Sequence, residues 1–140
     1  MRILCVCTGN TCRSPMLAAL LRARLAASGR SGITVESAGT GAADGEPASV
    51  GAGRAMARRG IDLTDHASRH LDTVDLSGID LVLCMSSAHA AAVRAHGVPP
   101  QAIRVVNAEH GGVPDPFGGD DRAYEACALV LESAARQVVG

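Results

Sequence analysis

Four short segments of this chain have the hydrophobic pattern of strands, and segments with helical periodicity separate and follow them. Residues 3–6, 79–85 and 103–106 are mainly apolar, and residues 33–36 alternate between apolar and polar; all four are of strand length. Helices are predicted at residues 16–27, from Pro47 to about Arg59, at 88–96 and at 122–139, with a short turn of helix at 72–76. Strands should therefore alternate with helices through the whole chain.

The first predicted helix has the clearest signals. Its leucines at positions 17, 20, 21 and 25 share one helical face, and Ser28-Gly29 is a typical helix end. Ser14 and Pro15 are predicted to begin it, as a capping hydroxyl followed by a ring with a suitable φ. Two glycine-containing segments are predicted to lack regular structure: a turn at residues 37–41 and a long loop at residues 107–121.

This alternation favours an α/β fold with a parallel sheet and right-handed crossovers. We predict a single domain, residues 1–140, with a four-stranded flavodoxin-like sheet of order 2-1-3-4 and helices on both faces. Ligands bind such sheets at the carboxyl ends of the strands. The segment after the first strand is therefore the first place to look for chemistry.

That segment combines an anion-binding loop with a nucleophile. The first strand leads directly into Cys7-Thr8-Gly9-Asn10-Thr11-Cys12-Arg13-Ser14, before Pro15. A strand, a tight loop and a helix start together aim backbone N–H groups at one point, which suits a phosphate. An electropositive helix start beside an arginine also favours the thiolate form of a cysteine. The loop is therefore predicted to cradle a phosphoryl group above the Cys7 thiol.

The other loop residues fit this prediction. Arg13 can hold two phosphoryl oxygens at once, which a lysine cannot do. Gly9 and Asn10 tolerate the left-handed backbone that a loop with inward amides needs. Ser14 can donate its hydroxyl to the Cys7 sulfur. Two alternative interpretations of Cys5, Cys7 and Cys12 are zinc ligands, although their spacing is not a standard one, and small buried residues, which suits Cys5 on the strand.

Transfer of a phosphoryl group to Cys7 needs a proton donor for the leaving group, and Asp115 is the candidate. Pro114 and Pro116 restrict its backbone, and it follows the fourth strand, at the same sheet edge as the loop. The alternative is that Pro-Asp-Pro is only a surface turn. Asp120 and Asp121 are predicted to begin the last helix. The five histidines are scattered in sequence, and surface or hydrogen-bonded structural roles are expected for them.

Composition narrows the classes of partner. Of the 140 residues, 47% are hydrophobic and 19% charged, with a net charge of −1, which argues against nucleic acid or a membrane surface as the main partner. The only aromatic residues are Phe117 and Tyr124, so base stacking is not expected. Five cysteines, three of them within eight residues, suit reduced thiols. With no signal peptide expected before the first strand, we predict a cytoplasmic monomer without cofactor or metal.

The loop sequence from Val6 to Met16 resembles the Cys-x5-Arg-Ser signature of the low-molecular-weight protein tyrosine phosphatase family. Ser37-Ala38-Gly39, the segment from Asp80 to Met85, and Asp115-Pro116-Phe117-Gly118-Gly119 are similar to further family landmarks. The resemblance implies phosphorylated protein substrates, a phosphocysteine intermediate, and Asp115 as the acid that later activates water. Ser86-Ser87 departs from the family pattern, where some members have an acidic residue.

Thr11 and the tail after Asp115 resemble the bacterial protein-arginine phosphatase branch. Tyrosine-specific relatives usually have a bulkier aliphatic residue at position 11, so Thr11, with Phe117, is expected to influence substrate choice. Phosphoarginine is thus the predicted substrate, and phosphotyrosine the alternative. Two less favoured functions are a thiol-dependent arsenate reductase, for which suitably placed resolving cysteines are lacking, and a non-catalytic phosphoprotein-binding module. Cys12 either fills the loop or forms a protective disulfide with Cys7 under oxidation.

Overall fold

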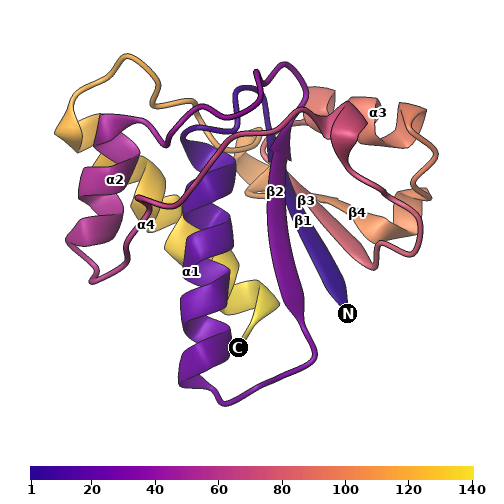
Figure 1. The fold of residues 1–140 in the computed structure, drawn as a ribbon, viewed down its shortest axis with the longest axis horizontal. Helices are drawn as coiled ribbons and strands as arrows, with labels where there is room; N and C mark the ends of the chain where they lie inside the picture. The colour runs from indigo at the N-terminus through magenta and orange to yellow at the C-terminus, as the bar shows by residue number, and fades with distance from the viewer.

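The computed structural model describes residues 1–140 and contains one sheet with helices on both faces (Figure 1). The strands are all parallel and run in the order β2-β1-β3-β4, as predicted. Their bounds are β1 (Arg2–Cys7), β2 (Thr34–Gly39), β3 (Leu81–Cys84) and β4 (Ile103–Val105). The chain passes from β1 to β2 on one side and later to β3 on the other, so the switch point of the topology lies at the end of β1.

Four helices connect and follow these strands. They are α1 (Arg13–Ala27), α2 (Val50–Ala57), α3 (Ser87–Ala95) and α4 (Asp121–Val138), with short 3-10 turns η1 (Leu71–Thr73), η2 (Pro100–Ala102) and η3 (Ala108–His110). Helices α1, α2 and α4 lie on one side of the sheet and α3 on the other (Figure 1). None of the helices combines the length and the apolar character that a membrane crossing requires.

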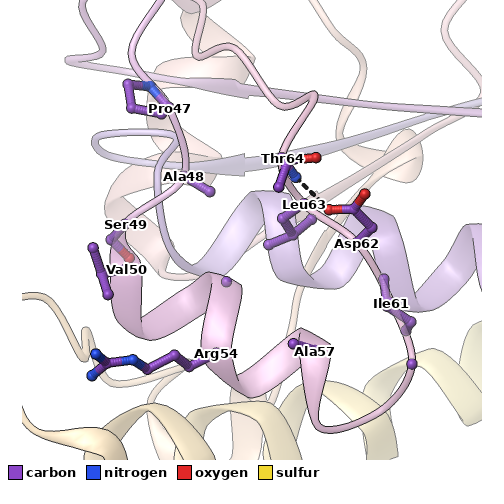
Figure 2. Close-up of a pocket in the computed structure, with 12 residues that line it drawn as sticks. Pro47, Ala48, Ser49, Val50, Arg54, Ala57, Ile61, Asp62, Leu63 and Thr64 are labelled. Atoms are coloured by element: carbon purple, nitrogen blue, oxygen red, sulfur yellow. Dashed lines mark hydrogen bonds between the residues drawn. The ribbon is translucent and has the colours of Figure 1, made fainter.

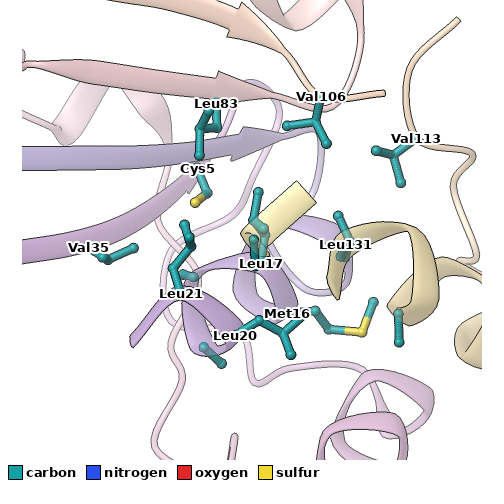
Figure 3. Close-up of a cluster of buried hydrophobic side chains, with 14 of the residues drawn as sticks. Cys5, Met16, Leu17, Leu20, Leu21, Val35, Leu83, Val106, Val113 and Leu131 are labelled. Carbon is teal, nitrogen blue, oxygen red and sulfur yellow. The ribbon is translucent and has the colours of Figure 1, made fainter. Parts of the chain in front are cut away.

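The uninterrupted apolar run of β1 is explained by burial on both of its faces. Ile3 and Cys5 belong to the larger buried cluster, with α1 and α4, whereas Leu4 and Val6 belong to the smaller cluster, with α3. Successive strand side chains point to opposite faces, so a central strand needs apolar residues at every position. Figure 3 shows the larger cluster, in which Leu17 and Leu21 of α1 pack beneath the sheet.

The second strand extends further than the sequence predicted. Ser37, Ala38 and Gly39 were expected in a turn, but they continue β2 and pair with Cys5, Val6 and Cys7. The pairing brings β2 alongside the start of the loop, where a Cβ on Gly39 would lie 2.3 Å from the Thr8 carbonyl oxygen. The glycine is therefore explained by close backbone approach and not by a turn.

Several helix boundaries also differ from the prediction. Ser14 does not cap α1: the residue at the cap position is Cys12, without a side-chain cap, because the Ser14 hydroxyl is used inside the site. Helix α2 begins only after Ser49, whose hydroxyl accepts the Ala52 N–H. The turn expected at 72–76 is the shorter η1, and the loop at 107–121 contains η3. Asp120 caps α4 as expected.

Candidate active site

The loop between β1 and α1 lies at the carboxyl end of the sheet, at the switch point between β1 and β3. Asn10 adopts a left-handed backbone, with a φ of 56°. Its amide side chain is completely buried and donates to the hydroxyls of Ser14 and Ser37, at 2.8 and 2.9 Å. Its side-chain oxygen accepts the Arg69 N–H at 3.0 Å. Asn10 thus fixes the fold of the loop from inside, which explains how a polar side chain can be fully buried.

The carbonyl groups of the loop are held from outside it. The pairs, with donor before acceptor, are Thr40 N to Cys7 O (2.9 Å), Gly41 N to Thr8 O (3.0 Å), His66 Nε2 to Asn10 O (2.7 Å), Ser49 N to Thr11 O (2.9 Å) and Met16 N to Cys12 O (3.2 Å). In a trans peptide the carbonyl and the following N–H point in opposite directions. Donors placed around the outside therefore turn the amides of the loop toward its centre.

The backbone N–H groups that follow these five carbonyls, those of residues 8, 9, 11, 12 and 13, donate to no acceptor within the protein. Five amides with this orientation form a concave site for an anion, and the start of α1 adds the positive end of its dipole. The loop is therefore preorganised for the oxygens of a phosphoryl group.

Cys7 lies at the base of this concavity. Its thiol is 2% exposed, and the sulfur is 2.9 Å from the Ser14 hydroxyl oxygen. That oxygen already accepts a hydrogen bond from Asn10, and its other neighbour, the Ala38 carbonyl, is 3.5 Å away. The longer distance to Ala38 favours donation from the Ser14 hydroxyl to the sulfur, which is the kind of hydrogen bond that a thiolate nucleophile needs.

The remaining cysteines have different surroundings. Burial raises the pKa of Cys84 and of Cys127 to about 12 and raises the pKa of Cys5 still further, so these thiols stay protonated. The Cys12 sulfur is 3.2 Å from the Ser49 hydroxyl and 3.3 Å from the Tyr124 hydroxyl, which connects the loop to α2 and α4. All five are free thiols, and no three or more His, Cys, Asp or Glu side chains are arranged to hold a metal ion. Oxidation of Cys7 and Cys12 to a disulfide stays a prediction.

Arg13 and Asp115 come together as the sequence predicted. The Arg13 side chain is 8% exposed; its Nη1 donates to the Val113 carbonyl at 2.9 Å, and its Nη2 lies 3.6 Å from Asp115 Oδ2. The Asp115 side chain is 52% exposed. One end of the guanidinium is thus fixed, while the carboxyl beside it faces solvent, where a leaving group would depart.

A pocket of about 200 Å³ is lined by all of these groups: Cys7, Thr8, Gly9, Asn10, Thr11, Cys12, Arg13, Asp115 and Phe117. Phe117 is 71% exposed, and its N–H donates to Asp115 Oδ1 at 3.1 Å. Thr11 is only partly buried. The size of the pocket suits a phosphoryl group and the atoms next to it, and leaves the rest of a substrate outside.

A larger cavity, of about 680 Å³, lies between α2 and residues 60–64, and Figure 2 shows its lining. Its carboxylate, Asp62, accepts the Thr64 N–H at 2.9 Å, and its lining contains no thiol or histidine. The smaller pocket is therefore the candidate active site, because it contains the thiol, the arginine and the carboxyl group, although the other cavity has the larger volume.

Four residues support the loop, although the sequence did not connect them with it: Ser49, His66, His89 and Tyr124. For His66 and His89 the expected hydrogen-bonded structural role is confirmed, but not its partner. All four lie far along the chain and reach the loop only through the fold, so no local motif marks them. Burial lowers the pKa of His66 and of His89, so both rings favour the neutral form.

Comparison with known proteins gives one consistent family. The model of the low molecular weight phosphotyrosine protein phosphatase family matches residues 2–139. A protein-arginine-phosphatase of Geobacillus stearothermophilus is 38% identical over 137 residues, covering 94% of this chain and 89% of that protein. A probable low molecular weight protein-tyrosine-phosphatase, EpsP of Ralstonia nicotianae, is 38% identical over 132 residues, covering 93% and 88%.

Solved structures agree with this comparison. The YwlE arginine phosphatase, as a C7S mutant with a phosphorylated active-site serine, superimposes with a TM-score of 0.90 at 34% identity, covering 99% of this chain and 93% of that one. The similarity covers nearly all of this chain, both sides of the pocket included, and most of the other.

Proposed function

Because the chain belongs to the low-molecular-weight phosphotyrosine protein phosphatase family, we propose that it dephosphorylates proteins through a phosphocysteine on Cys7. The observation that supports this most strongly is the convergence of five free loop amides, the Cys7 thiol, Arg13 and Asp115 on one small pocket. Each is needed by the proposed reaction, and each comes from this one chain.

In the first half of the reaction the Cys7 thiolate attacks phosphorus while the bond to the leaving group breaks. The loop amides and Arg13 bind the three equatorial oxygens, on which charge is spread in the transition state. Asp115 donates its proton to the departing nitrogen or oxygen. A positioned acid of this kind contributes a factor of about 10² to 10⁴.

In the second half the phosphocysteine is hydrolysed. The Asp115 carboxylate, now without its proton, accepts one from a water molecule as the water oxygen attacks phosphorus. The phosphorus–sulfur bond breaks, phosphate leaves, and Cys7 returns to the thiolate that Ser14 stabilises. One residue acts first as acid and then as base, which leaves the enzyme unchanged after each turnover.

Phosphoarginine is the proposed substrate class. Thr11 lines the pocket and offers a hydroxyl where a larger aliphatic side chain would suit a phenyl ring. Asp115 is exposed enough for one oxygen of its protonated carboxyl group to accept a hydrogen bond from an N–H of the substrate while its O–H donates the proton to the departing nitrogen. Phe117 can stack on either a guanidinium or a phenyl plane and does not discriminate between them.

Overall identity does not decide between the two substrates, because arginine- and tyrosine-phosphatase relatives are both 38% identical to this chain. The choice depends on Thr11 and Asp115, and phosphotyrosine is the second candidate. A comparison of kcat/KM for matched phosphoarginine and phosphotyrosine peptides tests it. We expect the phosphoarginine peptide to be preferred.

Replacing Thr11 by Ile should move the preference toward phosphotyrosine by about 1–3 kcal/mol, the usual value of one pocket contact. Thr64→Ile, at an exposed threonine outside the pocket, is the matched control and should leave the ratio unchanged. If the parent prefers phosphotyrosine and Thr11→Ile leaves the ratio as it was, the arginine assignment is wrong.

We further propose that the enzyme acts as a monomer in the cytoplasm, on phosphoproteins and without metal or cofactor. A complete set of reacting groups in one chain and a thiolate that must remain reduced support this. Light scattering at working concentration should give the mass of a single chain. Activity should be retained in the presence of a metal chelator.

A further inference from the structure

His89 is a buried titratable side chain that the proposed reaction does not use. It lies in the first turn of α3 and is 5% exposed. Its Nε2 is 2.8 Å from the hydroxyl oxygen of Thr8, the residue directly after the nucleophile. Its Nδ1 is 2.9 Å from the hydroxyl oxygen of Ser86, the N-cap of α3. One imidazole therefore connects the end of β3 to the phosphate loop.

The bonding around Ser86 indicates which nitrogen of the ring carries the proton. The Ser86 oxygen accepts the His89 backbone N–H at 3.3 Å, as an N-cap does. The structure offers the hydroxyl hydrogen of Ser86 no acceptor within the protein except Nδ1, so we infer that Nδ1 is unprotonated and accepts it. In a neutral ring the proton is then on Nε2, where it is donated to the Thr8 oxygen.

The surroundings of the ring favour its neutral form. Burial lowers the pKa of His89, and the positive charge of Arg13 lowers it further, while Asp115 opposes this. The neutral form is the one that can accept from Ser86 and donate to Thr8 at the same time.

Thr8 is held at both of its polar groups. Its carbonyl accepts the Gly41 N–H at 3.0 Å, and its side chain is bound by His89. The Gly41 bond fixes the peptide plane after Thr8, and the bond from Thr40 N–H to the Cys7 carbonyl fixes the plane before it. The His89 bond holds the residue between these two planes, which carry the first two free amides of the loop.

We propose that His89 is a positioning residue, whose Nε2–H bond to Thr8 holds the amides of Thr8 and Gly9 toward the bound phosphoryl group. The inference rests on the proposed function for its effect on turnover. Its effect on anion binding and its tautomer are independent of which substrate is hydrolysed.

Binding of inorganic phosphate and kcat/KM on an aryl phosphate test the proposal in three variants. His89→Ala should weaken phosphate binding and lower kcat/KM, each by about 3- to 10-fold, the value of one hydrogen bond. His89→Gln, whose amide can donate to Thr8, should recover most of both. His96→Ala is the matched control: it removes a histidine at the other end of α3, bonded to Asp72 at 2.6 Å, and should change neither.

A double-mutant cycle distinguishes an effect of His89 through its hydrogen bond to Thr8 from a general loss of packing. Thr8→Val keeps the shape of the side chain but removes the acceptor, and adding His89→Ala to it should cause little further loss. Additive losses, or a His89→Ala effect no larger than that of His96→Ala, would overturn the proposal.

Nitrogen NMR of the labelled protein gives a direct readout of the ring. The signals that disappear in His89→Gln should report a neutral imidazole with the proton on Nε2 at neutral pH. A proton on Nδ1 would contradict the proposal even in a fully active enzyme. An enzyme that hydrolyses neither phosphopeptide but shows the Nε2–H tautomer and the phosphate-binding loss would instead refute only the proposed function.

Discussion

The phosphate loop and the segment at residues 115–119 line the same pocket, yet they are held in different ways. Five carbonyls of the loop accept hydrogen bonds from the two residues after β2, from α1 and from distant loops, and the Cys7 and Asn10 side chains are buried. The hydrogen bonds of residues 115–119 are made within that segment, apart from the ion pair of Asp115 with Arg13. The side chains of Asp115 and Phe117 in this segment face solvent.

This difference matches the two tasks of a phosphatase. Every substrate presents the same phosphoryl group, so a rigid, preorganised set of amides can serve all of them. The leaving group varies between substrates. The residues that contact it lie on the less constrained segment, residues 115–119, and at the opening of the pocket. The comparison predicts that changes in the loop affect all substrates alike, whereas changes in the segment depend on the leaving group.

Cys7→Ser should have the largest effect, with turnover reduced to the background level. The serine hydroxyl is a far weaker nucleophile, but the free amides and Arg13 remain, so affinity for inorganic phosphate should be largely kept. Steady-state kinetics and calorimetric titration with phosphate measure the two effects. Cys127→Ala, which removes a protonated thiol on α4, is the control and should stay active. A Cys7→Ser variant that turns over normally would refute the assigned nucleophile.

Arg13→Lys should lower kcat by about 10² or more on every substrate, despite the preserved charge. A lysine cannot donate to the Val113 carbonyl and hold two phosphoryl oxygens at once. Arg54→Lys, at an exposed arginine paired with Asp121, is the matched control and should remain near the parent. If kcat falls only a few-fold, Arg13 contributes its positive charge alone, and the proposed contact with two phosphoryl oxygens is wrong.

Asp115→Asn should slow substrates with basic leaving groups by about 10² to 10⁴ and those with good leaving groups much less. A weakly basic leaving group departs without a proton, so the acid contributes little to it. Asp120→Asn is the control, because Asn also caps a helix and should preserve the bond to the Ala123 N–H. Equal losses on both substrates, or a larger loss in Asp120→Asn, would assign the acid elsewhere.

The sequence predicted the fold and the placement of the candidate site residues better than the residues that support the loop. Strand order and the meeting of Cys7, Arg13 and Asp115 followed from apolar runs and from the rule that parallel strands end at one edge. The cap assigned to Ser14 was wrong because the hydroxyl had two possible partners, and tertiary contact with Cys7 decided between them. The end of β2 was also misjudged, since glycine indicates a close approach as readily as a turn.

The supports of the loop could not be predicted, for a physical reason. His66, His89 and Tyr124 are separated from the loop by more than fifty residues, and each makes an ordinary hydrogen bond. A single sequence shows that such residues can form hydrogen bonds but not with which partner. Only the packed structure brings them to the same eight residues.

The most direct test of the central claim is to identify the phosphorylated atom during turnover. The enzyme is mixed rapidly with an excess of a substrate that has a good leaving group, quenched within the first turnovers, digested, and examined by mass spectrometry under conditions that preserve phosphorus–sulfur bonds. The account predicts one phosphoryl group per active site, on Cys7, and none in Cys7→Ser. A phosphoryl group on any other residue, or full turnover with no covalent intermediate, would contradict it.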